Sequence, residues 1–348
     1  MAARFHRLSV RRVDHPTADS AAITLDVPPE LTDRFAFAPG QWLTVRHGDE
    51  RRSYSICAPR GQAPRIGVRE VPGGAVSGWL VHEVRPGDVL DVLAPSGTFT
   101  PDVDIPGSHA LLAAGSGITP LLSIAGSVLA AQEKSSVTLI YGNRRVDSVM
   151  FVDEIADLKD AHPARMRVIH LLSREAHEVE LFNGRLDATK LRTLLPATIE
   201  VGAIDHWWIC GPYAMAVDAA AVLAEFGVPA DRIHRELFYV GDEPPQPRQH
   251  EEPAAVVGAE VTIVLDRRTS TVAIPPGVPI LDGVQRVRPD LPFACKGAVC
   301  GTCRARLIDG QVTMRRNYAL EQAELDAGYV LTCQSLPTTD RVTLSYDG

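Results

Sequence analysis

The sequence contains no long hydrophobic run and no excess of positive charge, and both absences narrow its function. No apolar stretch of its 348 residues approaches the roughly 20 residues that span a bilayer, so we expect no membrane insertion. The formal net charge is −8, whereas a nucleic-acid-binding surface needs clustered Lys and Arg, so we expect no nucleic-acid partner. No apolar segment of signal-peptide length follows the N-terminal arginines, which predicts a cytoplasmic location.

Cysteine is also scarce, with six residues in the chain. In a cytoplasmic protein we expect thiols, metal ligands or redox groups, because the cytosol keeps thiols reduced. Four cysteines follow the plant-type ferredoxin spacing, C-x4-C-x2-C and a distant fourth, which predicts a [2Fe–2S] cluster on Cys295, Cys300, Cys303 and Cys333. A structural zinc site is the main alternative, although zinc sites usually pair two short knuckles. Cys57 and Cys210 lie outside this pattern.

The order of apolar runs divides the chain into three predicted domains. Residues 1–104 contain short alternating apolar and polar runs broken by turns, which is typical of a small antiparallel β-barrel. Residues 105–240 alternate apolar strands with helix-length segments, which indicates an α/β domain with a parallel sheet. The prolines and charges of residues 241–258 predict an interdomain linker, and residues 259–348 form the domain with the cysteine loop.

Two glycine turns follow apolar strands of the α/β domain. Gly115 and Gly117 in AAGSGITP lie between a strand and a helix-like stretch, and Gly211 in ICGPYAM ends another strand. Because ligands bind at the carboxyl ends of parallel strands, the two turns outline a crevice for a nucleotide. A G-x-G turn taken alone is equally consistent with tight strand-to-helix packing.

Two motifs of the barrel suit a flat ring that carries phosphates. In RRSYSIC, Tyr54 is expected to pack on the ring while Ser55 hydrogen-bonds to its edge. In VPGGAVSGWL, Gly73, Gly74 and Ser77 stand at a turn into a helix, where phosphate oxygens bind. Each motif taken singly is also explained by barrel packing and a capped helix.

The segments RRSYSIC, VPGGAVSGWL, AAGSGITP, ICGPYAM and HRELF occur in the order found in the ferredoxin–NADP reductase superfamily. The whole chain resembles members with a C-terminal plant-type ferredoxin domain. The resemblance implies an FAD-binding antiparallel β-barrel, an α/β NAD(P)-binding domain and a β-grasp [2Fe–2S] domain, and the choice of FAD over FMN rests on it alone. YGNRR, LLSRE, LFNGRLDA and NYALE resemble the reductase subunits of bacterial phenylacetyl-CoA epoxidases.

The resemblance also implies roles for individual residues. Ser55, Cys210 and Glu236 are expected at the site of hydride transfer, where the cofactors carry the chemistry and no covalent nucleophile is needed. The residues expected to bind flavin are Arg52, Ser53, Tyr54, Ser55, Gly73, Gly74, Val76, Ser77, Glu236 and Phe238. The residues expected to bind the nicotinamide nucleotide are Gly115, Gly117, Ile118, Thr119, Ser173, Arg174, Cys210, Gly211 and Pro212.

Two positions depart from the family pattern. Ala298 stands in the cluster loop where relatives commonly carry glycine, and a positive φ there would cost alanine roughly 1 kcal/mol. We expect the loop to tolerate this cost. Leu237 replaces a frequent arginine, and we attach no function to that change.

The choice between NADPH and NADH depends on the 2′-phosphate, which needs hydroxyls and cations at the edge of the nucleotide domain. Ser173 and Arg174 in LLSRE follow a predicted strand at that edge and favour NADPH through charge complementarity. An acidic residue there would instead hold the free ribose hydroxyl of NADH. Arg144 and Arg145 either assist Arg174 or are solvated surface charges.

The predicted reaction is an electron relay from NADPH through FAD and the [2Fe–2S] cluster to an oxygenase. From Glu260 onward the chain has ten acidic and ten basic residues, and this neutral balance suggests that flavin of the same chain reduces the cluster. The expected partner is a multicomponent oxygenase, the di-iron phenylacetyl-CoA 1,2-epoxidase of phenylacetate degradation. A reductase of a Rieske-type oxygenase, such as a ketosteroid hydroxylase, and a flavin/iron–sulfur redox sensor are the alternatives.

Overall fold

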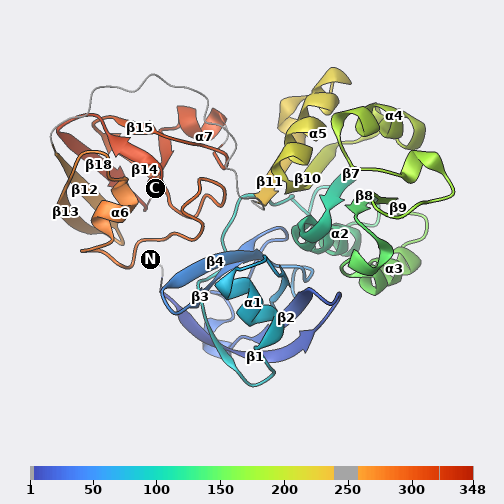
Figure 1. Cartoon of the computed structure of the whole chain (residues 1–348), viewed down its shortest axis with the longest axis horizontal. Helices are drawn as coiled ribbons and strands as arrows, with labels where there is room; N and C mark the ends of the chain where they lie inside the picture. Colours follow the sequence, from blue (N-terminus) through green and yellow to red (C-terminus); the bar gives the residue numbers. More distant parts are fainter. Residues whose placement is uncertain (1–3, 239–257, 321, 348) are drawn as a thin grey trace. The chain divides into compact units, whose positions relative to one another are not determined.

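The computed structural model describes residues 4–238, 258–320 and 322–347 (Figure 1). They form two compact units, the larger within residues 7–45 and 54–240 and the smaller within residues 241–348 together with 1–6 and 46–53. The larger unit contains a parallel sheet and most of an antiparallel sheet, and the smaller unit contains the cysteine loop. The predicted linker, 241–258, lies outside the described residues except for Gly258. None of the described helices is long and apolar enough to cross a membrane.

The antiparallel sheet has the strand order β4-β3-β6-β1-β2-β5. In its first strand, the buried Leu8 and Val10 alternate with exposed residues, as expected for a strand with one buried face. A bridge between Ile56 and Ile66 connects the chain after β4 to β5, so the sheet closes and the predicted barrel is confirmed. Its elements are β1 (His6–Asp14), β2 (Ser20–Asp26), β3 (Trp42–His47), β4 (Glu50–Ser55), β5 (Arg65–Arg69), β6 (Val89–Val92) and helix α1 (Ala75–His82).

The parallel sheet has the strand order β11-β10-β7-β8-β9, with all neighbours parallel as predicted. Helices α2 and α3 contribute to the hydrophobic cluster on one face, and α4 and α5 to the cluster on the other. Because both faces are covered, a central strand such as β7 is almost entirely apolar. The elements are β7 (Ser108–Ala114), α2 (Ile118–Ala131), β8 (Ser136–Asn143), α3 (Val152–Ala161), β9 (Met166–Leu172), α4 (Ala188–Thr198), β10 (His206–Pro212), α5 (Tyr213–Glu225) and β11 (Ile233–Phe238).

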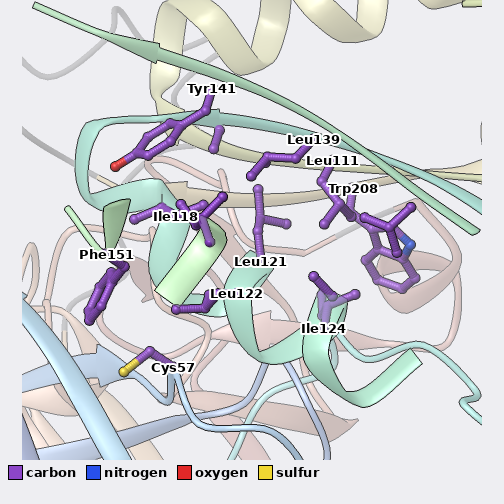
Figure 2. Packing of buried hydrophobic residues seen from close by; sticks show 14 of the residues in the cluster. Cys57, Leu111, Ile118, Leu121, Leu122, Ile124, Leu139, Tyr141, Phe151 and Trp208 are labelled. Atoms are coloured by element: carbon purple, nitrogen blue, oxygen red, sulfur yellow. The ribbon is translucent and has the colours of Figure 1, made fainter. Parts of the chain in front are cut away.

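The barrel and the α/β part share a hydrophobic core within the larger unit. Cys57, which follows β4, belongs to the same cluster as Leu121 of α2 and Trp208 of β10 (Figure 2). Phe99, which follows β6, belongs to this cluster as well. The buried hydroxyl of Ser123 in α2 donates a hydrogen bond of 2.6 Å to the carbonyl oxygen of residue 58. This packing fixes the ends of the barrel strands against the α/β part.

The smaller unit contains a mixed sheet in the order β13-β12-β18-β14-β16 and a two-stranded sheet of β15 and β17. Strands β12 and β18 are parallel while the other paired neighbours are antiparallel, in agreement with the predicted β-grasp. The cysteine loop lies between α6 and β14, and Cys333 follows β16. The elements are β12 (Ala259–Leu265), β13 (Arg268–Ile274), α6 (Ile280–Val284), β14 (Arg304–Asp309), β15 (Val312–Met314), α7 (Gln322–Asp326), β16 (Tyr329–Leu331), β17 (Ser335–Pro337) and β18 (Arg341–Ser345).

Candidate functional site

Three predicted site residues from separate strands meet at the carboxyl ends of β10 and β11. Ser55, the last residue of β4, donates a hydrogen bond from Oγ to Glu236 Oε2 over 3.0 Å. Cys210 Sγ donates to the same carboxyl oxygen over 3.9 Å, and the two residues are direct partners in the register of the parallel strands. The structure therefore brings together the three residues expected at the site of hydride transfer.

Burial decides the protonation of this group. Loss of solvent raises the pKa of Glu236 to about 8, although the hydrogen bonds from Ser55 and Cys210 oppose this shift. Burial and the neighbouring carboxyl also raise the pKa of the Cys210 thiol well above its usual value. At neutral pH Glu236 therefore holds a proton, and Cys210 is a thiol and not a thiolate nucleophile.

The two glycine turns of the nucleotide crevice lie against each other. A Cβ atom on Gly117 would lie 2.1 Å from the carbonyl oxygen of Cys210, so only glycine allows this approach. A Cβ atom on Gly211 would lie 3.1 Å from the Cβ of Ala114, at the end of β7. The two turns therefore lie together where β7 and β10 end, and the nucleotide crevice there stays a prediction.

The turn after β7 is a short 3-10 helix, Gly115–Gly117, which leads directly into α2. Its first carbonyl accepts a 2.9 Å hydrogen bond from the hydroxyl of Tyr141 in β8. The buried Thr119 donates from Oγ1 to the carbonyl oxygen of Ser116, and Ile118 is buried in the core. Sequence reasoning missed Tyr141, because nothing in the strand around it signals a contact with a distant turn.

The turn before α1 suits phosphate oxygens. Gly73 has a φ of 74°, and Gly74 occupies the N-cap position without a side-chain cap for the helix N–H groups. Ser77 Oγ donates to the carbonyl oxygen of Gly74 and accepts from the N–H of Val71, so it shapes the turn. Val76 is buried in the barrel core. The uncapped N–H groups fit the phosphates of a dinucleotide such as FAD.

Strand β4 carries three further predicted flavin residues, Arg52, Ser53 and Tyr54. Tyr54 is half-buried and packs against the barrel core, while Ser53 is half-buried. Arg52 is exposed and forms an ion pair with Glu50, with Nη2 and Oε2 2.7 Å apart. Binding of a phosphate by Arg52 therefore requires exchange of this ion pair.

The edge predicted to select the nucleotide lies after β8 and β9. The N–H of Ser173 donates to the carbonyl oxygen of Asn143, and the N–H of Arg174 donates to that of Arg144, over 2.9 and 2.8 Å. Ser173 and Arg174 are thus placed beside Arg144. Sequence reasoning missed Glu175, whose carboxylate accepts a hydrogen bond of 3.0 Å from the N–H of residue 146. The sequence could have indicated Glu175, because it directly follows Arg174.

Two further predicted residues end neighbouring strands. Pro212, the last residue of β10, is exposed and is the register partner of Phe238 in β11. Phe238 is partly buried and packs against the core cluster that contains Cys210. The strand register thus places both residues beside the Cys210 and Glu236 pair.

The four cysteines of the predicted cluster form two pairs. The Cys300 thiol hydrogen-bonds to Cys295 and, with backbone N–H groups, lowers the pKa of Cys295 to about 6. The Cys303 thiol likewise lowers the pKa of Cys333. In the described part of the chain, no three Cys, His, Asp or Glu side chains are grouped to hold one metal ion. Two separate thiol pairs fit a two-iron cluster better than a single zinc ion.

The cluster loop turns its backbone inward. Cys295 Sγ accepts hydrogen bonds from the N–H groups of Gly297 and Cys300, over 3.3 and 3.4 Å. Lys296, Ala298 and Gly301 have positive φ angles of 51°, 66° and 64°. The strain anticipated at Ala298 is therefore present, and its side chain is buried in the core of the unit. Such N–H donors stabilise thiolate charge and tune a bound cluster.

Comparison with known protein families matches two parts of the chain. Residues 111–221 match the oxidoreductase NAD-binding domain, and residues 263–338 match the 2Fe-2S iron-sulfur cluster binding domain. These segments contain the glycine turn after β7 and the four paired cysteines. The matches agree with the two sites that the geometry outlines.

Relatives match the chain over nearly its whole length. A component of the 1,2-phenylacetyl-CoA epoxidase of Escherichia coli (strain K12) is 39% identical, covering 99% of this chain and 98% of its own. The ferredoxin reductase component of 3-ketosteroid-9-alpha-monooxygenase from Rhodococcus rhodochrous is 32% identical, covering 97% and 96%. The solved structure of phthalate dioxygenase reductase shares the fold with a TM-score of 0.60 at 23% identity, covering 98% of both chains.

Proposed function

The chain belongs to the ferredoxin–NADP reductase superfamily, in the branch with a C-terminal [2Fe–2S] domain, and from this premise we propose that it is the NADPH-dependent reductase of a di-iron phenylacetyl-CoA 1,2-epoxidase. It is a reductase that delivers electrons to an oxygenase, as its relatives of full length are components of such systems. The convergence of Ser55, Cys210 and Glu236 carries the reductase part of this proposal.

The residues of the site position the reactants and keep one proton on a carboxyl group. Ser55 and Cys210 hold the Glu236 carboxyl in place, and the raised pKa of Glu236 keeps a proton on it at neutral pH. The uncapped turn at Gly74 holds phosphate oxygens, and the half-buried Tyr54 packs on a flat ligand. FAD, when bound, supplies the conversion of a two-electron hydride into single electrons.

The reductase activity is tested by mixing the purified holoprotein with NADPH under anaerobic conditions and recording its absorbance. Both the flavin band and the cluster band are expected to bleach. Reduction of neither group would contradict the proposed function. A purified protein that lacks the iron–sulfur spectrum would contradict the assignment of the four cysteines.

The preference for NADPH rests on the charges after β8 and β9. A backbone hydrogen bond places Arg144 beside Arg174 at this edge, while the Glu175 carboxylate accepts from a backbone N–H. Arg174→Ala is expected to lower kcat/KM for NADPH by about 10- to 100-fold and to leave NADH nearly unaffected. Arg145→Ala is the matched control, because Arg145 pairs with Asp147 over 3.4 Å. Equal losses for both nucleotides in Arg174→Ala would contradict the preference.

The choice of oxygenase rests on similarity over the full chain, 39% to the epoxidase component and 32% to the ketosteroid component. Coupled turnover with each purified oxygenase, at equal reductase concentration, separates the two candidates. We expect faster product formation with the phenylacetyl-CoA epoxidase. Faster turnover of a ketosteroid oxygenase would favour the second candidate instead.

A further inference from the structure

A chain of hydroxyl groups connects the end of the ferredoxin unit to two of the four cysteines. Thr332, which directly precedes Cys333, is fully buried. Its Oγ1 donates to the carbonyl oxygen of Cys303 over 3.0 Å, and its N–H donates to the same oxygen over 3.2 Å. The hydroxyl oxygen of Tyr346 lies 2.7 Å from Thr332 Oγ1. Thr332 therefore links the backbone of one ligand to the residue beside another.

The direction of these hydrogen bonds follows from the number of protons. A threonine hydroxyl has one proton, and a carbonyl oxygen only accepts. Because Thr332 donates its proton to Cys303, Tyr346 must donate to Thr332 Oγ1. Both hydroxyl dipoles therefore point toward the Cys303 carbonyl, and hydrogen bonds in such a chain strengthen one another.

Backbone hydrogen bonds fix both ends of this chain. The N–H of Tyr346 donates to the carbonyl oxygen of Val264 in β12 over 2.9 Å. The carbonyl oxygen of Thr332 accepts from the N–H of Leu281 in α6 over 3.0 Å. The aromatic ring of Tyr346 packs against the hydrophobic core of the unit. The hydroxyl chain is thus held by two elements that contain no cysteine.

We propose that Thr332 and Tyr346 are positioning residues for the iron–sulfur cluster, which fix the Cys303 and Cys333 pair and help to set the reduction potential. This inference rests on the cluster of the proposed function. Groups that hydrogen-bond to ligating residues orient them and tune the metal. Without the two hydroxyl groups, fewer hydrogen-bond donors offset the partial negative charge of the Cys303 carbonyl oxygen. This charge then disfavours the additional electron of the reduced cluster, so the reduction potential falls.

The test is an anaerobic redox titration of the full-length holoprotein, followed by the electron paramagnetic resonance of the reduced cluster. In Thr332→Val the ratio of reduced to oxidised cluster, measured at the wild-type midpoint, is expected to fall about tenfold, which equals about 59 mV for one electron. Tyr346→Phe is expected to lower this ratio about threefold. Thr332→Ser keeps the hydroxyl and should restore the wild-type ratio.

Tyr329→Phe is the matched control, since it removes a tyrosine hydroxyl from the same unit at a ring that packs over Arg304. It should titrate like the wild type. If Tyr346→Phe keeps the wild-type potential and spectrum, the inference is overturned, even if Thr332→Val fails to fold. A wild-type protein without a reducible cluster would instead overturn the proposed function, so the two failures are distinguishable.

Discussion

The cluster loop and the group of Ser55, Cys210 and Glu236 give their cysteines different hydrogen-bond partners. In the loop, N–H groups and a neighbouring thiol lower the pKa of Cys295 to about 6, which prepares a thiolate for iron. In the second site, burial beside a carboxyl raises the pKa of Cys210 and keeps it a thiol. The partner thiols and burial also raise the pKa values of Cys300 and Cys303 in the loop. The partner of the thiol therefore distinguishes the two places: a second thiol and backbone N–H groups in the loop, a buried carboxyl at Cys210.

The largest effect is expected where a ligand of the cluster is removed. Cys333→Ser should lower electron delivery to a one-electron acceptor through the cluster by about 100-fold or more, while reduction of the flavin by NADPH survives. Single-turnover absorbance and steady-state reduction of the acceptor measure the two steps separately. Cys57→Ser is the control, because this buried thiol donates only to the Arg65 carbonyl oxygen among the contacts described. Loss of flavin reduction in Cys333→Ser would contradict the separation of the two sites.

The next largest effect is expected at the close contact between the two glycine turns. In Gly117→Ala the new Cβ would lie 2.1 Å from the Cys210 carbonyl oxygen, so β10 must shift. We expect a loss of about 1–3 kcal/mol in the free energy of unfolding, with weaker NADPH binding. Denaturant unfolding and a binding titration measure both. Gly202→Ala, where a Cβ would meet nothing within 4 Å, should be near wild type; equal losses in both variants would contradict this explanation.

A pH-dependent effect is expected from Glu236. Its folded pKa of about 8 lies above the value of 4.5 expected without the fold, so the unfolded chain loses this proton first as the pH rises. The stability that protonated Glu236 contributes at low pH is therefore lost as the pH rises from about 4.5 to about 8. Glu236→Gln has no such proton to lose. Relative to the wild type, its free energy of unfolding should therefore rise by more than about 1 kcal/mol between about pH 4.5 and pH 8.

Thermal unfolding of both holoproteins at several pH values measures this gain. Glu225→Gln is the control, because the exposed Glu225 pairs with Arg192 and has a lowered pKa, so the fold favours its ionised form. Relative to the wild type, the free energy of unfolding of Glu225→Gln should fall as the pH rises. A difference for Glu236→Gln that is the same at all pH values would show that the fold does not raise the pKa of Glu236.

The smallest effect is expected at Ala298, which has a φ of 66°. Glycine would relieve about 1–2 kcal/mol of strain, but it gains freedom in the unfolded chain and removes a buried methyl group. We therefore expect Ala298→Gly to unfold within about 1 kcal/mol of the wild type and to keep the cluster. Ala298→Val should be clearly less stable and should lose the cluster faster. A stable valine variant would contradict the strain.

The same comparison explains what the sequence can predict. Three of the cluster cysteines lie in one short loop, so their spacing alone indicates the site, and the alternating runs of residues 1–104 indicate the barrel. The barrel, the parallel sheet and the β-grasp are all confirmed. Ser55 and Glu236 are 181 residues apart and meet only through the order of the strands, so the family resemblance had to supply that pair.

Contacts between distant side chains account for what sequence reasoning missed. The hydroxyl of Tyr141 reaches Gly115 from a neighbouring strand, and Tyr346 reaches Thr332 from the end of the chain. Neither pair has a short motif, since each depends on how two strands pack in three dimensions. The ion pair of Arg52 with Glu50 is a local contact instead, because residues two apart in β4 lie on the same face of the strand.

The central claim is that electrons pass from the flavin site to the cluster within one chain. Anaerobic stopped-flow mixing with excess NADPH, recorded in the flavin and cluster bands at several protein concentrations, tests it most directly. We predict that the flavin band falls first and that the cluster band follows at a rate independent of protein concentration. A cluster rate that rises in proportion to protein concentration would show transfer between molecules and would contradict the account.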